Sequence, residues 1–445
     1  MTTPLWTVSV LLASIAIIVV TIVKFKLHPF LALLLASFFT GTLMGMNPQD
    51  MVAAIENGIG GTLGFLAAVI GLGTILGKMM ETSGAAERIG LTLQKSRWLS
   101  ADVIMVLVGL ICGITLFVEV GVVLLIPLAF SVARKTNTSL FRLAIPLCTA
   151  LMAVHCVVPP HPAALFVTNK LGADVGTVIV YGLLVGLVAS LIGGCLFLKL
   201  MGERVPFKTV PQAFSSLAVR EEHTLPALST SLFVVLLPIG LMLIKTVSEL
   251  YLPAGGSATR MLTFIGNPVT AMFIAVFVAY YMLGLRRNEN MGSLLTSTEN
   301  GFGSIANILL IIGAGGAFNG ILKESGLAQV LAEILSNLHM HPILLAWLIA
   351  LILHAAVGSA TVAMMGATGI VGPMLSLYPG VSPEIMVIAI GSGAIGCTIV
   401  TDSLFWLVKQ YCGATLSETF RYYTSATLIA SFVALGCTFM LSYII

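Results

Sequence analysis

The segment Val157-Val158-Pro159-Pro160-His161-Pro162 lies inside a stretch, residues 143–169, that contains no Asp, Glu, Lys or Arg. Such a stretch is long enough to cross the hydrocarbon core of a bilayer as a helix. Three prolines in four positions cannot continue an α-helix, because each lacks the N–H donor and clashes with a preceding carbonyl. The sequence therefore predicts a broken helix at 157–162, whose free carbonyls and new helix N-terminus suit small polar or anionic groups.

The composition of the whole chain indicates a membrane protein. Of its 445 residues, 58% are hydrophobic and 9% are charged, whereas soluble domains are about 25% charged. Seven cysteines without a CxxC pair predict neither a disulfide framework nor a zinc site. The formal net charge of +3 gives no reason to expect nucleic-acid binding. The fold class that follows is an all-α polytopic membrane protein, with the lipid bilayer as a partner.

Two apolar stretches, 103–133 and 342–376, are too long for one upright helix and carry small or polar residues at mid-length. We interpret both as re-entrant hairpins, which lipid tolerates only where protein or water surrounds the tip. The prediction is about 11 transmembrane helices plus these two hairpins. If the N-terminus is outside, only four of the 21 Lys and Arg residues face the exterior, namely Lys170, Lys245, Arg260 and Lys323.

The two halves of the chain resemble each other. The motif Glu-Asn-Gly-x-Gly at 56–60 recurs at 299–303, and the segment around Cys156 recurs 241 residues later around Cys397. Each half contains one hairpin and one break, and the two halves have opposite orientations in the predicted topology, which is typical of secondary transporters. We divide the chain into a first inverted repeat at 1–200, a polar cytoplasmic linker at 201–226 and a second inverted repeat at 227–445.

Five ionisable side chains lie within apolar stretches, where a charged group costs roughly 2.5–3.5 kcal/mol at a helix centre. They are Glu119, His155, His161, His354 and Asp402. Asp402 lies in a second predicted break, 398–403, and is the counterpart of His161 at the offset of 241 residues. We therefore expect a histidine and an aspartate at equivalent breaks around one cavity. Glu119, His161 and Asp402 are the candidates for proton coupling, and the alternative for each is a hydrogen-bonded side chain that holds two helices together.

The hairpin tips and the breaks supply the candidate substrate-binding residues. The first tip reads Phe-Val-Glu-Val-Gly at 117–121, and the second reads Gly-Ser-Ala-Thr at 358–361. Small hydroxyl residues at a tip offer donors to a carboxylate without bulk, although Ser and Thr also pack between helices. The candidates are Glu119, Val120, Gly121, Pro160, His161, Ser359, Ala360, Thr361, Thr398, Thr401, Asp402 and Ser403.

Other glycine patterns have packing explanations. Glycines spaced by four residues predict close helix contacts, at Gly60/Gly64, Gly73/Gly77 and Gly109/Gly113. The run 71–79 imitates a phosphate-binding loop, but its spacing is wrong and Met79 stands where Ser or Thr must hold magnesium. The sequence thus predicts no nucleotide site and no coupling to ATP. It also predicts no metal site.

Four motifs together resemble the gluconate permease family of proton symporters, over essentially the whole chain, at 117–121, 159–162, 358–363 and 402–406. Gluconate carriers of that family tend to follow the proline–histidine motif with Gly-Pro and to read Asn-Asp-Pro-Gly-Phe-Trp at the second break. This chain has Ala163-Ala164 and, at 401–406, Thr-Asp-Ser-Leu-Phe-Trp. In that respect it is similar to the D-serine permease branch of the family.

The resemblance implies a particular fold and activity. It implies a scaffold domain that mediates dimerisation and a mobile transport domain, made of hairpins and broken helices, that moves as an elevator. It further implies proton-coupled uptake of D-serine, or a close small amino or hydroxy acid, across the bacterial inner membrane. The implied assembly is a homodimer with the proton as coupling ion and no organic cofactor.

Three alternatives stay open at this point. The nearest is a symporter for gluconate or another sugar acid, which is an anion without an ammonium group. A passive channel is a second alternative, although inverted hairpins argue against it. An intramembrane enzyme would need a nucleophile and a base, and Ser359 with His354 is the pair that the sequence offers.

Overall fold

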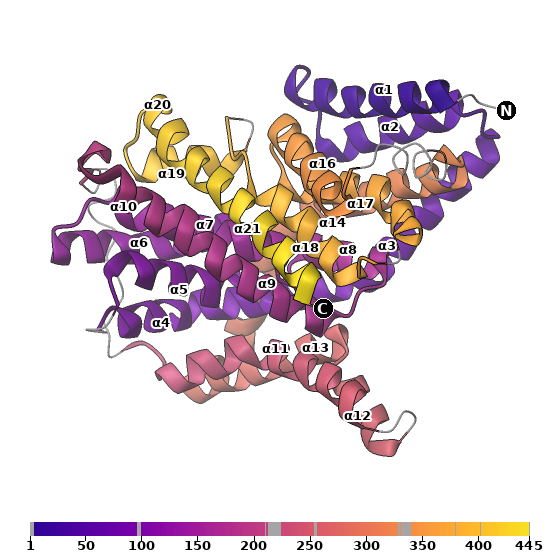
Figure 1. Ribbon diagram of the computed structural model, residues 1–445. Helices are drawn as coiled ribbons and strands as arrows, with labels where there is room; N and C mark the ends of the chain where they lie inside the picture. The colour runs from indigo at the N-terminus through magenta and orange to yellow at the C-terminus, as the bar shows by residue number, and fades with distance from the viewer. Residues whose placement is uncertain are drawn as a thin grey trace.

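The structure is a computed structural model that describes residues 4–95, 99–209, 211, 224–252, 256–327, 330, 340–378, 380–400 and 402–444. Over these residues it contains helices and no strand (Figure 1). The helices before the linker are α1 (Pro4–Val23), α2 (Pro29–Leu43), α3 (Pro48–Thr82), α4 (Ala85–Gln94), α5 (Ala101–Gly113), α6 (Val118–Thr136), α7 (Phe141–Val157), α8 (Pro162–Leu171), α9 (Val175–Ser190) and α10 (Phe197–Met201). Those after it are α11 (Leu228–Tyr251), α12 (Ser257–Ile265), α13 (Pro268–Ala279), α14 (Met291–Glu324), α16 (Pro342–Val357), α17 (Ala360–Val371), α18 (Pro383–Ile395), α19 (Ser403–Tyr411), α20 (Leu416–Glu418) and α21 (Ser425–Ile444). Thus the all-α class is confirmed.

Prolines and caps set many of the helix ends. Helices α2, α3, α8, α13, α16 and α18 have Pro in their first turn, where the missing N–H would be unpaired in any case. The Asn47 side chain caps α3 by accepting the N–H of Gln49. Helices α8 and α16 end at Gly172 and Gly358, whose positive φ angles of 69° and 73° suit glycine.

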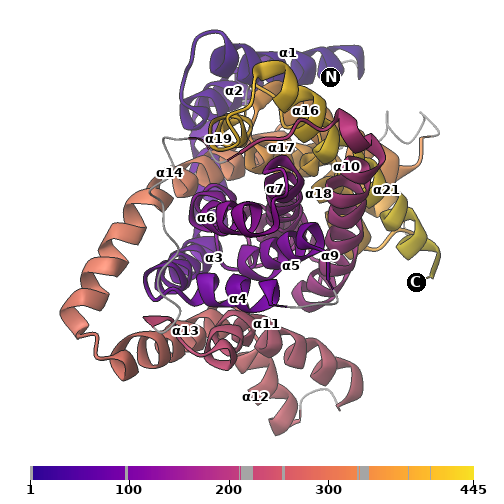
Figure 2. The ribbon, with the colours of Figure 1, turned by 90° about the vertical axis from the view of Figure 1, so that its left-hand side faces the viewer.

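The core is centred on α7. The segment Phe141–Leu171, which contains α7 and α8, has an 18-residue apolar window of which 94% is buried inside the protein, and α5, α6, α9 and α18 pack around α7. Figure 2 shows α5, α6 and α7 at the centre, with α1 and α2 on one side and α11 to α13 on the opposite side. The break that follows α7 is therefore surrounded by protein, which is the condition under which irregular backbone exists at membrane depth.

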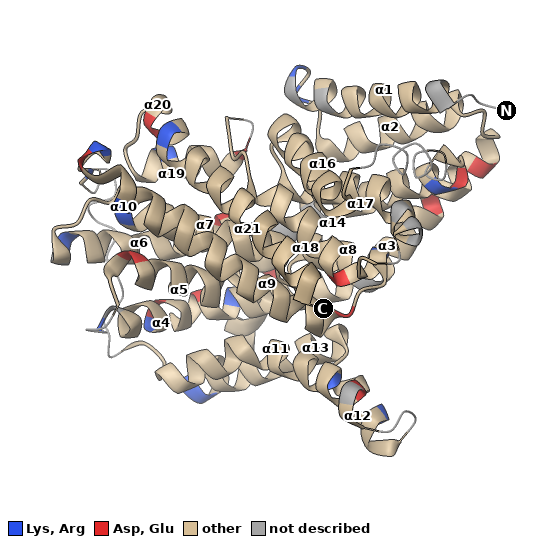
Figure 3. Ribbon diagram, in the orientation of Figure 1, with Lys and Arg blue, Asp and Glu red and all other residues tan. Residues whose placement is uncertain are grey.

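Several helices suit a bilayer by length and composition. Five segments are long and apolar enough to cross a membrane, namely Phe141–Leu171, Val175–Arg204, Leu228–Glu249, Pro268–Arg287 and Leu416–Ile444. There are up to six if the bent pair Pro48–Gly64 and Leu66–Thr82 is one span. Figure 3 shows many of the basic residues at one end of the bundle, near α4, α6 and α10. The count of about 11 transmembrane helices stays a prediction.

Each predicted hairpin and each predicted break falls on a pair of consecutive helices. The four junctions are 114–117 between α5 and α6, 158–161 between α7 and α8, 358–359 between α16 and α17, and 396–402 between α18 and α19. Whether the hairpins re-enter the membrane, and whether the halves form inverted repeats, stays a prediction. Within the predicted linker, residue 210 and residues 212–223 lie outside the described residues.

One close helix contact is made by Gly58 and not by the predicted pair Gly60/Gly64. Helices α3 and α14 pack against each other, and a Cβ on Gly58 would lie 2.5 Å from the carbonyl oxygen of Gly316. A Cβ on Gly60 or Gly64 would meet nothing within 4 Å, so the predicted contact at Gly60/Gly64 is wrong. Spacing alone does not show which face of a helix meets its neighbour.

We expect Gly58→Ala to lower the thermal unfolding temperature of the detergent-solubilised protein, because an added methyl group would push α3 and α14 apart. Overpacking of this kind costs about 1–3 kcal/mol. Gly60→Ala, on the same helix with open space at its Cβ, is the matched control and should leave the unfolding temperature near that of the unmodified protein. Equal unfolding temperatures for the two variants would contradict the close approach at Gly58.

Candidate functional site

Both helix breaks end in a residue that begins the next helix. His161 is the N-cap of α8 and Asp402 is the N-cap of α19. The Oδ1 atom of Asp402 accepts the backbone N–H of Leu404 at 2.7 Å, which places the carboxyl group where the dipole of α19 favours a negative charge. The two residues thus take the same place relative to their helices.

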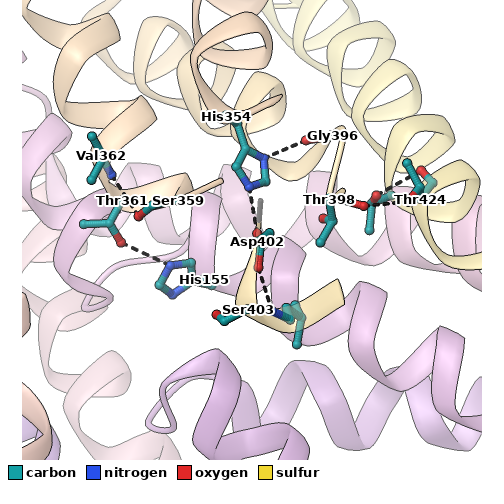
Figure 4. Close-up of polar contacts among 12 residues, drawn as sticks. His155, His354, Ser359, Thr361, Val362, Gly396, Thr398, Asp402, Ser403 and Thr424 are labelled. Atoms are coloured by element: carbon teal, nitrogen blue, oxygen red, sulfur yellow. Dashed lines mark hydrogen bonds and ion pairs between the residues drawn. The ribbon is translucent and has the colours of Figure 1, made fainter. Parts of the chain in front are cut away.

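His354, in the last turn of α16, joins the second hairpin to the second break. Its Nδ1 atom lies 2.6 Å from the carbonyl oxygen of Gly396, and its Nε2 atom lies 2.9 Å from Oδ2 of Asp402 (Figure 4). His354 is fully buried and Asp402 is 6% exposed. The imidazole therefore bridges two segments of the second half inside the protein.

An equivalent contact joins the first hairpin to the first break. The Nε2–H of His161 donates to the carbonyl of Gly113, the last residue of α5. The His161 ring also packs edge-on against Phe117 and His155, at centroid distances of 6.5 and 5.2 Å. Each hairpin thus contacts the break of its own half.

Two further contacts link each hairpin to the other half. The Thr361 hydroxyl of α17 lies 3.4 Å from Nε2 of His155 on α7, and the Ser403 hydroxyl of α19 donates to Oε1 of Glu119 on α6 at 3.2 Å. Nδ1 of His155 is buried and has no hydrogen-bond partner within the described part of the chain. A polar atom in that position is suited to a guest molecule or water.

These contacts surround a cavity of about 170 Å³. Of the predicted binding residues, six line it, namely Glu119, Ser359, Ala360, Thr361, Asp402 and Ser403. Pro160 and His161 line a much smaller neighbouring cavity, of about 20 Å³, on the other side of Phe117. The tips of both hairpins and the second break therefore meet at one site.

The remaining predicted residues lie elsewhere or outside the described residues. Val120 is half-buried against the apolar core, and a Cβ on Gly121 would lie 2.9 Å from the side chain of Leu151, so Gly121 serves packing against α7. The carbonyl of Thr398 accepts the hydroxyl of Thr424 at 2.6 Å, on the side away from the cavity (Figure 4). Thr401 lies outside the described residues.

Several residues at or beside the cavity are absent from the predicted binding set, and four of them have side chains that can contact a polar substrate or its partners. Met152, His155 and Asn307 line the cavity, and His354 binds Asp402 behind it. The two histidines carried a sequence signal, since each is an ionisable residue in an apolar stretch. Met152 and Asn307 carried none, because a methionine on α7 or an asparagine on α14 is unremarkable without knowledge of the neighbouring helix.

The cavity can recognise both charged ends of a small zwitterion. It contains two carboxyl groups, from Glu119 and Asp402, which can bind an ammonium group, and no Lys or Arg lines it. The first turn of α17, capped by Ser359, and the Thr361 hydroxyl offer donors to a carboxylate. Among the described residues, no group of three or more His, Cys, Asp or Glu side chains is arranged to hold a metal ion.

Apolar helices that surround a polar cavity at two hairpin tips and a helix break are typical of membrane transporters. The chain belongs to the GntP permease family, whose model matches residues 6–444. It is 78% identical to the D-serine transporter DsdX of Escherichia coli over 99% of both chains. It is 40% identical to a gluconate permease of Pseudomonas aeruginosa, over 98% of this chain and 97% of that one.

The fold is shared with a solved transporter of much lower similarity. The YdaH transporter of Alcanivorax borkumensis matches with a TM-score of 0.61 at 17% identity, over 88% of this chain and 89% of that chain. The family and the apolar helices together make this protein a multi-pass transporter of the inner membrane, and not an enzyme.

We expect Ser359→Cys to react with a membrane-impermeant, charged thiol reagent, because position 359 lines a polar cavity that a water-soluble reagent can reach. Ser392→Cys, on the fully buried face of α18, is the matched control and should not react beyond the level of the unmodified chain. Mass spectrometry of the labelled protein measures both. Labelling of position 392 but not of position 359 would contradict a water-accessible cavity at the second hairpin tip.

Proposed function

We propose that this protein takes up D-serine, or a close small amino or hydroxy acid, together with protons across the inner membrane. The main observation in favour of D-serine as the substrate is the 78% identity to a D-serine transporter over 99% of both chains. The cavity supports it independently, because two carboxyl groups line it and no Lys or Arg does. A zwitterion brings the ammonium group that those carboxyl groups can pair with, whereas a sugar-acid anion would find no basic partner.

The two ends of the substrate have separate partners in this proposal. The ammonium group lies between Glu119 and Asp402, and the carboxylate accepts hydrogen bonds from the second hairpin tip around Ser359 and Thr361. The N-terminus of α8, after Pro160, offers a further set of donors. His155 lines the cavity and is the proposed partner of the hydroxyl group of serine.

The proposed energy source is the proton gradient, with Glu119, His161 and Asp402 as the groups that exchange the proton. Glu119 and Asp402 line the cavity, so a proton bound there is close to the substrate. An organic cofactor has no part in the proposal.

The proposed architecture is two inverted repeats with a scaffold and an elevator-type transport domain, in a homodimer. The helix boundaries support the repeats. Helices α5, α8 and α9 begin at residues 101, 162 and 175, and α16, α19 and α20 begin 241 residues later at 342, 403 and 416. Repeats of this kind produce inward-open and outward-open states of similar energy.

Transport in proteoliposomes tests the proposal directly. We expect the purified protein to accumulate labelled D-serine when the outside is more acidic than the lumen, and unlabelled D-serine to compete far better than gluconate. Uptake is expected to collapse when a protonophore removes the gradient. Competition by gluconate alone would instead favour the sugar-acid symporter, and downhill, non-saturable flux would favour a passive channel.

The contact between Thr361 and His155 provides a site variant. We expect Thr361→Val to raise the half-saturation concentration for D-serine roughly 2- to 13-fold, since a hydrogen bond contributes about 0.5–1.5 kcal/mol. Thr368→Val, on the same helix, is the matched control, because that hydroxyl bonds the carbonyl of Met364 within α17. An unchanged half-saturation concentration for Thr361→Val would remove this hydroxyl from the binding site.

A further inference from the structure

The same hairpin-to-break contact occurs once in each half of the chain, with different chemistry. In the first half, His161 donates to the carbonyl of Gly113. In the second half, Nε2 of His354 meets Oδ2 of Asp402 at 2.9 Å. Residue 354 follows 113 by 241 positions, and residue 402 follows 161 by the same number. A backbone carbonyl cannot titrate, whereas a histidine and an aspartate can.

The second contact requires one proton between the two side chains. The carbonyl of Gly396 can only accept, so the hydrogen on the His354 ring in that contact is on Nδ1. A neutral imidazole then presents a bare Nε2 lone pair to Asp402. An ionised Asp402 carries no hydrogen either, so the two atoms attract each other only when a proton is on Nε2 or on Oδ2. Loss of that proton leaves two lone pairs in contact, which repel.

We propose that the His354–Asp402 pair binds the coupling proton, and that this proton fastens the second hairpin to the second break. The proposal rests on the proton-coupled uptake proposed above. It gives His354 the role of a positioning residue, which acts through Asp402 and does not touch the substrate. Of the three groups proposed above to exchange the proton, Asp402 is the one that carries it. His161 keeps its hydrogen bond to Gly113 whenever Nε2 carries hydrogen, so the contact between the first hairpin and the first break is retained when the His354–Asp402 pair loses its proton.

The described groups that face the His354–Asp402 pair include no Lys or Arg that could take the place of the proton. Glu119 from α6, His155 and Cys156 from α7, and Tyr423 from the π-helical turn Thr419–Thr424 are close enough to interact electrostatically with one member of it. Helices α1, α17 and α21 carry no Asp, Glu, Lys, Arg or His, and Glu384 lies at the far N-terminal end of α18. Among the described residues, no Lys or Arg lines the cavity that Asp402 borders, so none of them supplies a fixed positive charge there in place of the proton.

The pair is placed to couple proton binding to substrate binding. Asp402 and the hairpin-tip residues Ser359 and Thr361 line the same cavity, and α16, which ends just before that tip, carries His354. With the proton in place, the tip is held against the break and its donors stay in position for the substrate. Proton release frees the tip. By reciprocity, the protonated protein binds the substrate more tightly, and the bound substrate holds the proton more tightly.

The test uses the purified full-length protein in proteoliposomes with labelled D-serine. The variant His354→Gln supplies a permanent amide donor to Asp402 that does not titrate. Asp402→Asn is a second variant, which donates to Nε2 of His354 and still caps α19. His341→Gln, at the exposed N-terminus of the same helix, is the matched control. Solute exchange without a pH gradient, its half-saturation concentration at several pH values, and uphill uptake with acid outside are measured for each.

In the unmodified protein and in His341→Gln, we expect uphill uptake and a half-saturation concentration that rises up to about tenfold per pH unit on the alkaline side, as expected for one linked proton. In His354→Gln, we expect exchange to persist, its half-saturation concentration to become independent of pH, and uphill uptake to be lost. In Asp402→Asn, which also removes one proposed partner of the substrate ammonium group, we expect a raised half-saturation concentration that is likewise independent of pH, and no uphill uptake.

Each other result has a distinct meaning. Absence of uphill uptake by the unmodified protein would refute the proposed proton coupling itself. Uphill uptake by His354→Gln at the unmodified level, with the same pH dependence, would overturn the assignment to this pair. Loss of exchange in His354→Gln, in protein that still elutes as a folded species, would overturn it as well, because a permanent donor should replace the proton.

Discussion

In a lipid bilayer, an unpaired backbone N–H or C=O group costs several kcal/mol, so the four helix junctions of this chain need protein around them. The structure provides it through α7, which belongs to Phe141–Leu171, the most buried of the five described apolar segments that are long enough to cross a membrane, and through α18, which packs on α7. The junctions then satisfy one another. Gly113 is paired by His161, and Gly396 is paired by His354. The ionisable residues at the helix junctions thus complete the hydrogen bonding of the backbone there as well as forming the site.

The two halves of the chain make the same hairpin-to-break contact with different chemical groups. The first hairpin meets its break through a carbonyl and a histidine, and the second meets its break through a histidine and an aspartate. The backbone plan is shared, but only the second contact depends on a proton. A proton can shift the balance between two transporter states of similar energy only if it binds one state more tightly than the other. The proton contact proposed for the second half provides such a difference.

The chemistry of the cavity also separates substrates within one fold. Two carboxyl groups, an imidazole and hydroxyl groups line it, and no Lys or Arg of the described residues does. The family includes relatives named for D-serine and for gluconate, so one family fold is shared by carriers named for different solutes. This is the usual relation between fold and function.

Much of this protein follows from local sequence. The apolar composition sets the membrane class, and prolines and charge-free stretches place the junctions, because helix breaking and lipid solubility are properties of a few adjacent residues. The pairing of His354 with Asp402, the opening of His155 into the cavity and the packing of Gly58 instead of Gly60 were decided by the tertiary structure. Each depends on which face of a helix meets a segment far along the chain. The sequence pattern does not show how far each helix is rotated about its own axis, because the packing of all the helices together sets that rotation.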